Sequence, residues 1–276
     1  MSRPLPPEMH DFIVDFLHDE RAALKACCLV SKSWVPRTRR HLFAHIEFED
    51  DPPSIFPWMT TFPDPSNSPA HFTRSLVVHG SLATTAPCIS WIRAFSSVVR
   101  LHFDFDGSHL TPLHGFSHTL KSLHLNYRAP LPPSKIFGFV CSFPLLEDLL
   151  LSPLCDSVTV HEWSVPSTSP KFTGTLRLRT LFSVDPIIRY LMELPDGLRF
   201  TRIELFCISG DAKSVTDLVS SCSGTLKSLW VSYNATSEFS ALTSAVCRCL
   251  TTVCEHSPAS TFDQPIQPRE TRSREV

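Results

Sequence analysis

The amino-acid sequence predicts an α+β chain of the solenoid class, in which a short three-helix domain precedes an irregular array of helix–strand repeats. In that array we expect the helices outside and the parallel strands inside. Two observations carry the prediction. Residues 1–48 form an amphipathic segment, and one apolar spacing recurs across residues 71–256. Residues 49–70 are rich in proline and are expected to be a linker, and residues 257–276 form a polar tail expected to be disordered.

Composition narrows the functional classes. The 276 residues are 42% hydrophobic and 19% charged, which is typical of a globular chain. The net charge of −2 argues against bulk nucleic-acid binding. No apolar run approaches the roughly 20 residues of a membrane span, so we expect no membrane partner. Many of the ten cysteines lie in apolar segments, as free thiols do. We therefore expect a cytoplasmic or nuclear protein.

The N-terminal segment contains three helix-like stretches. The first begins at Pro6 and Pro7, where missing amide protons cost nothing. A second is expected over residues 20–30, and a third after Ser33 as its N-cap, with Pro36 in the first turn. The first stretch carries apolar residues at helical spacing: Met9, Phe12, Ile13, Phe16 and Leu17.

So short a segment buries too little surface to be comfortably stable alone. Its large apolar side chains also outnumber what one small core accommodates, so we expect the surplus to face a partner. The alternative is that they pack against the rest of the chain. Phe12 and Phe16 are expected inside the three-helix unit. Basic residues around Trp34 are interpreted as a solvated face or as a guide for an acidic partner: Lys32, Arg37, Arg39 and Arg40.

The central region repeats one pattern, in which an apolar anchor has apolar neighbours three residues before and two residues after it. The anchors lie 25, 22, 26, 32, 22 and 26 residues apart, close to the period of leucine-rich repeats. Helix-like segments ending near Pro144, Pro195 and Gly224 lie between some of them. The anchors are Leu76, Leu101, Leu123, Leu149, Leu181, Ile203 and Leu229.

A doubly wound α/β domain is the alternative fold, because it also alternates helix and strand. Its strands are usually continuous aliphatic runs followed by glycine-rich turns. The strand-like segments here interleave polar residues, as in SLHLNY over 122–127 and SLWVSY over 228–233. This interleaving favours the repeat array.

The N-terminal segment resembles an F-box, and the whole chain is similar to fungal F-box proteins with degenerate leucine-rich repeats. The matching positions are Leu5-Pro6, Glu8, Ile13, Leu17, Leu24 and Leu29-Val30-Ser31-Lys32-Ser33-Trp34. The resemblance implies a substrate-recognition subunit that docks a Skp-type adaptor of a cullin–RING ubiquitin ligase, while the repeats bind a target protein. Carried over by position, the adaptor contacts would be Leu5, Pro6, Ile13, Leu29, Val30 and Trp34.

Target contacts are expected on exposed strand positions: His102, Asp104, His124, Asn126, Trp230 and Ser232. His102 and His124 each follow an anchor, so we expect them side by side on one face. No catalytic motif or cofactor loop is present, and we expect neither an enzyme nor a cofactor. Two alternatives remain, an interaction scaffold without ligase coupling and a metal-dependent enzyme. One cluster has zinc-ligand chemistry but the spacing of a buried helix: Cys247, Cys249, Cys254 and His256.

Overall fold

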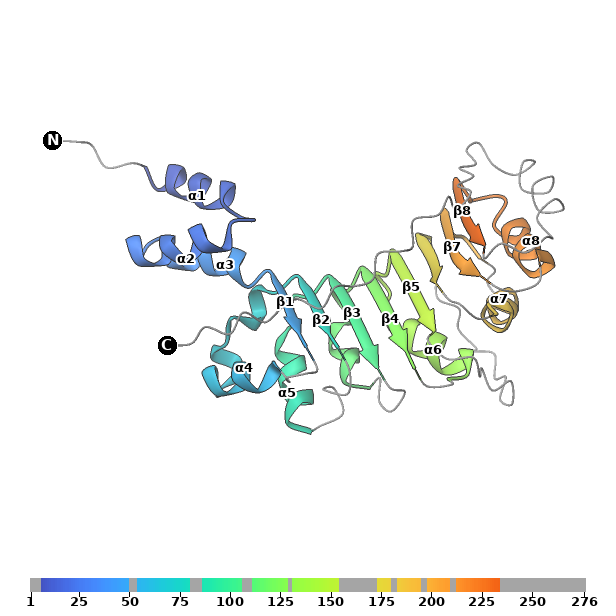
Figure 1. The fold of residues 1–276 in the computed structure, drawn as a ribbon, viewed down its shortest axis with the longest axis horizontal. Coiled ribbons are helices and arrows are strands. Elements are labelled where there is room, and N and C mark those ends of the chain that lie inside the picture. The colour runs from blue at the N-terminus through green and yellow to red at the C-terminus, as the bar shows by residue number, and fades with distance from the viewer. Residues whose placement is uncertain are drawn as a thin grey trace, which may run out of the picture.

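A computed structural model describes residues 6–49, 54–79, 86–105, 111–128, 131–153, 173–179, 183–194, 198–208 and 212–233. Its centre is one eight-stranded sheet in which all strands are parallel and their order follows the chain, from β1 to β8 (Figure 1). The strands are β1 His45–Phe48, β2 Ser75–Val78, β3 Arg100–Phe105, β4 Ser122–Tyr127, β5 Asp148–Pro153, β6 Thr175–Arg179, β7 Arg202–Ile208 and β8 Ser228–Tyr233.

The fold class predicted from the sequence is therefore wrong. The structure is an α/β fold with helices and an all-parallel sheet, similar to doubly wound proteins. It is not a short three-helix domain followed by an α+β solenoid array. The polar residues within the strands misled the prediction, because parallel strands are usually buried on both faces. Here strands such as β4 alternate between fully buried and half-buried residues, so one side faces the core and the other remains partly open.

The sheet core is organised by rows of residues that pair across all the strands. One row runs through Leu101 and Leu123 and includes Leu176 on β6, whereas the sequence spacing predicted Leu181. Leu181 lies outside the described residues. The row also begins one strand earlier than predicted, with Ile46 on β1. All its members are buried: Ile46, Leu76, Leu101, Leu123, Leu149, Leu176, Ile203 and Leu229.

Helices between the strands bury their apolar residues in the same core as this row. The helical spacings that end near Pro144, Pro195 and Gly224 are confirmed by α6, α7 and α8. The helices are α4 Ile55–Thr61, α5 Ala86–Ala94, α6 Pro133–Val140, α7 Asp185–Met192 and α8 Ala212–Ser221, with 3-10 turns at Pro65–Asn67, Pro69–Phe72 and Thr111–Phe116.

Part of the predicted proline-rich linker is helical. Helix α4 and two 3-10 turns occupy residues 55–72. Pro57 is the third residue of α4, and the amides of a first helical turn have no partner within the helix. Pro57, Pro65 and Pro69 therefore lie in the first turns of helical segments rather than in a continuous loop.

Three helices precede the sheet and lie beyond β1 in Figure 1: α1 Pro7–Phe16, α2 Arg21–Val30 and α3 Val35–Leu42. Pro36 falls in the first turn of α3, as expected, but the N-cap is Trp34. Ser33 does not cap the helix and instead contacts Ser31, with 2.9 Å between their hydroxyl oxygens. The chain then enters β1 directly, and the Ala44 carbonyl accepts hydrogen bonds from the amides of Arg74 and Ser75, where β2 begins.

Candidate functional site

A charged cluster joins the first and third helices. The Arg37 Nε donates to Asp15 Oδ1 at 2.7 Å, a second guanidinium nitrogen contacts Asp15 Oδ2, and His41 Nε2 lies 2.7 Å from Asp15 Oδ1. Bonds from Arg37 and then His41 hold the pKa of Asp15 well below its usual range. Asp15 in turn raises the pKa of Arg37. The cluster joins α1 to α3 and places Arg37, interpreted from the sequence as part of a solvated face or as a guide for an acidic partner, in an ion pair with Asp15.

The apolar residues buried by α1 and α2 are few, namely Val14, Leu24 and Cys27. Phe12 and Phe16 were expected inside this unit, and that expectation is wrong: their exposed fractions are 68% and 78%. Apolar residues surround most of α1, so periodicity alone could not choose which side faces inward. Because Val14 takes the inner position, Met9, Phe12 and Phe16 share the outer side at helical spacing.

The predicted adaptor-contact positions fall into three groups. Leu29 and Val30, at the end of α2, are 89% and 68% exposed. Pro6 is also exposed, while Ile13 and Trp34 are half-buried, and the Trp34 ring lies 5.4 Å from that of His10. Leu5 lies outside the described residues. We call the exposed apolar side chains on α1 and α2 the N-terminal apolar surface: Met9, Phe12, Phe16, Leu29 and Val30.

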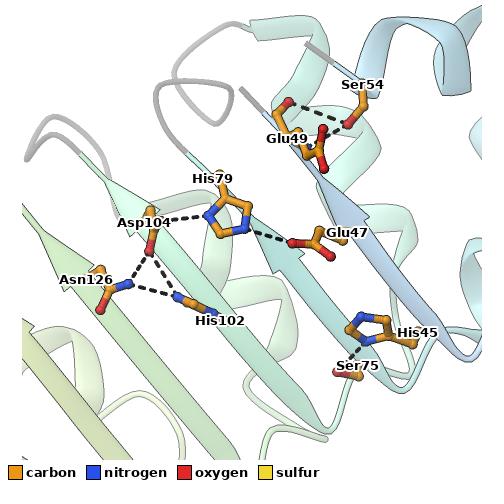
Figure 2. A network of polar contacts seen from close by, with 9 residues as sticks. All are labelled: His45, Glu47, Glu49, Ser54, Ser75, His79, His102, Asp104 and Asn126. Carbon is orange, nitrogen blue, oxygen red and sulfur yellow. Dashed lines mark hydrogen bonds and ion pairs between the residues drawn. The ribbon is translucent and has the colours of Figure 1, made fainter. Parts of the chain in front are cut away.

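A polar network crosses the open face of the sheet over β1 to β4 (Figure 2). His79, just after β2, lies between two carboxylates: its Nδ1 is 2.7 Å from Asp104 Oδ2 and its Nε2 is 3.1 Å from Glu47 Oε1. Burial alone would lower the pKa of His79, but the hydrogen bonds to Asp104 and Glu47 outweigh it and raise that pKa. The histidine therefore favours its charged form between these acids.

Asp104 is the centre of this network. Its Oδ1 accepts from Asn126 Nδ2 at 2.6 Å and lies 3.0 Å from His102 Nε2. Burial alone would raise the pKa of Asp104, but hydrogen bonds from His102, His79 and Asn126 keep it well below its usual range. Asp104 and Asn126 were expected as exposed target contacts, and the structure instead makes them half-buried and bonded to their neighbours.

The prediction that His102 and His124 lie side by side is confirmed. The two residues pair between β3 and β4, and their rings stack with centroids 3.9 Å apart. Burial, and next the nearby His102, lower the pKa of His124 to about 4, so its ring is neutral near pH 7. Ser152 Oγ on β5 lies 3.5 Å from His124 Nε2 but is almost fully buried, which places it poorly for attack on a substrate.

Charged and aromatic residues occupy the same face over β5 to β8. Arg177 lies between Asp148 and Glu204, at 3.3 and 3.4 Å, and Arg202 pairs with Glu204 at 2.5 Å. Trp230 and Ser232, the remaining predicted target contacts, are half-buried on β8. The Arg177–Glu204 pair was missed from the sequence, because the anchor assigned to this strand was Leu181 instead of Leu176.

Neither part of the site has the donors of a metal centre. Within the described ranges, no group of three or more His, Cys, Asp or Glu residues could hold a metal ion. The cluster with zinc-ligand chemistry, for which the spacing favoured a buried helix, lies outside those ranges: Cys247, Cys249, Cys254 and His256. Where the structure describes cysteines they are free, and burial raises the pKa of Cys141 to about 11, which keeps that thiol protonated.

Comparisons with known proteins give no independent assignment. Neither a protein-family model, nor a curated protein, nor a solved structure matches the chain. Among the described helices, none is long and apolar enough to cross a membrane. Any function proposed for the chain therefore rests on the N-terminal apolar surface and on the open face of the sheet.

Proposed function

We propose that the chain is the substrate-recognition subunit of a Skp–cullin–F-box ubiquitin ligase and acts without catalysing a reaction itself. In this proposal α1 to α3 dock a Skp-type adaptor, and the open face of the sheet binds a target protein. The observation that carries the proposal is the N-terminal apolar surface, which lies within the segment that resembles an F-box. The proposed compartment is the cytoplasm, the nucleus or both.

Exposure of several large apolar side chains to water costs free energy unless a partner covers them. Large apolar side chains gain roughly 1.5–3 kcal/mol each when they are buried. Leu29 and Val30 are adjacent at the end of α2 and are both exposed, so one partner pocket could bury both. Exposed Lys32, Arg39 and Arg40 follow closely in the sequence. These cations would speed the approach of an acidic adaptor.

The test is capture of a purified Skp-type adaptor by the full-length chain. We expect the wild type to retain the adaptor and the double variant Leu29→Asp, Val30→Asp to lose at least tenfold in affinity, since two charges would enter an apolar contact. Leu145→Asp is the matched control, because Leu145 is also an exposed leucine, at 48%, but lies near the sheet. That control should bind like the wild type.

Two results would oppose the proposal. If the double variant captured the adaptor as well as the wild type, the docking surface would lie elsewhere. If the wild type captured none, the chain would be better described as an interaction scaffold without ligase coupling. Circular dichroism of each variant would verify that α1 and α2 still form, since both substitutions lie at exposed positions.

A further inference from the structure

The charges on the open face of the sheet are mostly paired with one another. Asp104 contacts His79 and His102, and Arg177 lies between Asp148 and Glu204. These groups are already satisfied and offer little to a charged partner. A guanidinium or carboxylate without such a neighbour is therefore the place where a partner's charge would gain most.

Arg179, the last residue of β6, is such a group. It is exposed, and no ion pair or hydrogen bond joins it to another residue in the part of the chain described. Its positive charge also contributes to lowering the pKa of His124, after the larger effects of burial and of His102. Among the described residues, Arg179 is thus a cation without a paired acid.

An aromatic pair adjoins this cation. Phe206 on β7 is the residue that pairs with Arg179 across the strands, and the rings of Phe206 and Trp230 have centroids 4.3 Å apart. Both rings are half-buried. An apolar side chain placed on them would lie one strand away from a group bound to Arg179. Aromatic side chains next to arginine are also the residue types that dominate binding energy at protein interfaces.

We infer that this part of the face, consisting of Arg179, Phe206 and Trp230, binds an acidic peptide segment of the target, with a carboxylate on Arg179 and a neighbouring apolar side chain on the two rings. The inference rests on the proposed function and specifies the chemistry of its target. A single uncompensated cation matches one carboxylate. A phosphoryl group carries nearly two charges and would call for a further cation, but Arg177 and Arg202 are already paired with acids.

Nucleic acid fits this surface less well than a peptide. Its backbone presents many phosphates in a row, and binding it needs a series of unpaired cations. Here Arg177 and Arg202, the other cations of this part of the face, are already paired with Asp148 and Glu204 and do not extend such a series. The pairing of one cation with an aromatic pair is therefore better matched by mixed acidic and apolar side chains.

The experiment is selection of a random displayed-peptide library on the immobilised full-length chain, followed by fluorescence anisotropy with the enriched peptides. We expect enriched sequences to combine Asp or Glu with a nearby Leu, Phe or Trp. Arg179→Glu should weaken binding of an enriched peptide by at least about tenfold. The matched control is Arg100→Glu, because Arg100 is an exposed arginine on the same face but pairs with Ser75 and Ser122 instead of aromatic residues.

The result separates this inference from the proposed function. The Leu29→Asp, Val30→Asp variant should bind the peptides normally, and Arg179→Glu should capture the adaptor normally. Enrichment without acidic residues, equal loss in Arg179→Glu and Arg100→Glu, or binding that requires phosphorylated peptides would overturn the inference while leaving adaptor docking intact. Replacing the acidic residue of the enriched peptide by its amide should reproduce the loss, which tests the contact without any change to the protein.

Discussion

Asp104 shows how single residues order the open face of the sheet. Its carboxylate contacts His79, His102 and Asn126, which come from three adjacent strands or their ends. Together these contacts favour the ionised carboxylate, as its lowered pKa indicates. Asp104 therefore links neighbouring strands of the sheet. We expect its removal to lower the stability of the fold more than it affects binding.

We predict that Asp104→Asn lowers the free energy of unfolding by ~1–3 kcal/mol near pH 6, since the partners lose a charged acceptor. The folded pKa of Asp104 is lowered, so its contribution is present above the unfolded value near 3.9 and declines as pH falls toward the folded pKa. The folded pKa of His79 is raised, so its contribution is present below about 6.5 and is lost as pH rises through the folded value.

Urea unfolding of the wild type and of Asp104→Asn at several pH values measures the difference in their free energies of unfolding. The advantage of the wild type should be greatest between about pH 4 and 6.5 and smaller on either side. Glu147→Gln provides an acid-to-amide control, because Glu147 is exposed and, among the described residues, forms an ion pair only with exposed Lys121. Its effect should stay within ~0.5 kcal/mol. A difference between wild type and Asp104→Asn that is independent of pH would contradict the proposed role of the charge.

At the scale of elements, the strands were easier to infer than the side each helix turns inward. A strand of the SLHLNY type has two sides, and the row of leucines identifies the buried one. Helix α1 has apolar residues on several sides, so its spacing fits more than one orientation. The structure chooses Val14 as its inner residue, and the predicted interior positions Phe12 and Phe16 become surface.

Substitution of Leu176 tests the strand register of β6. It pairs with Leu149 and Ile203 and is fully buried, so Leu176→Ala should leave a cavity and lower the free energy of unfolding by ~2–5 kcal/mol. Leu150→Ala on the neighbouring β5 is the control, because Leu150 is only half-buried on the open face and its loss should cost clearly less. The measurement is urea unfolding at neutral pH. Equal costs for both would mean that β6 is not paired in this register.

At the scale of the whole molecule, the sequence predicted parallel neighbouring strands and their connecting helices but not the fold class. Recurrent spacing reports which residues share a row and which side is buried. It does not indicate whether the strands form one continuous α/β sheet, because the formation of such a sheet depends on contacts between residues far apart in the sequence. The interleaved polar residues proved to be one partly open face of that sheet.

The candidate site was predicted where equivalent positions recur, and was missed elsewhere. His102 and His124 follow successive anchors, so their contact could be inferred. Glu47 and His79 were missed because β1 has only four residues, too few for a periodic signal, and His79 lies just beyond β2. Arg179 was missed because the anchor of its strand was misplaced.

The two proposed surfaces lie on separate parts of the molecule, since α1 to α3 lie beyond β1 while Arg179 is on β6 (Figure 1). We therefore predict that a bound Skp-type adaptor slows amide hydrogen exchange in α1 and α2 without slowing it in β6 to β8. The reason is that covering Phe12, Phe16, Leu29 and Val30 stabilises helices that bury few residues of their own, and local opening governs exchange there. Exchange followed by mass spectrometry, with and without adaptor, gives the map. Protection confined to β6 to β8 would place the adaptor on the sheet and leave the N-terminal apolar surface without its proposed partner.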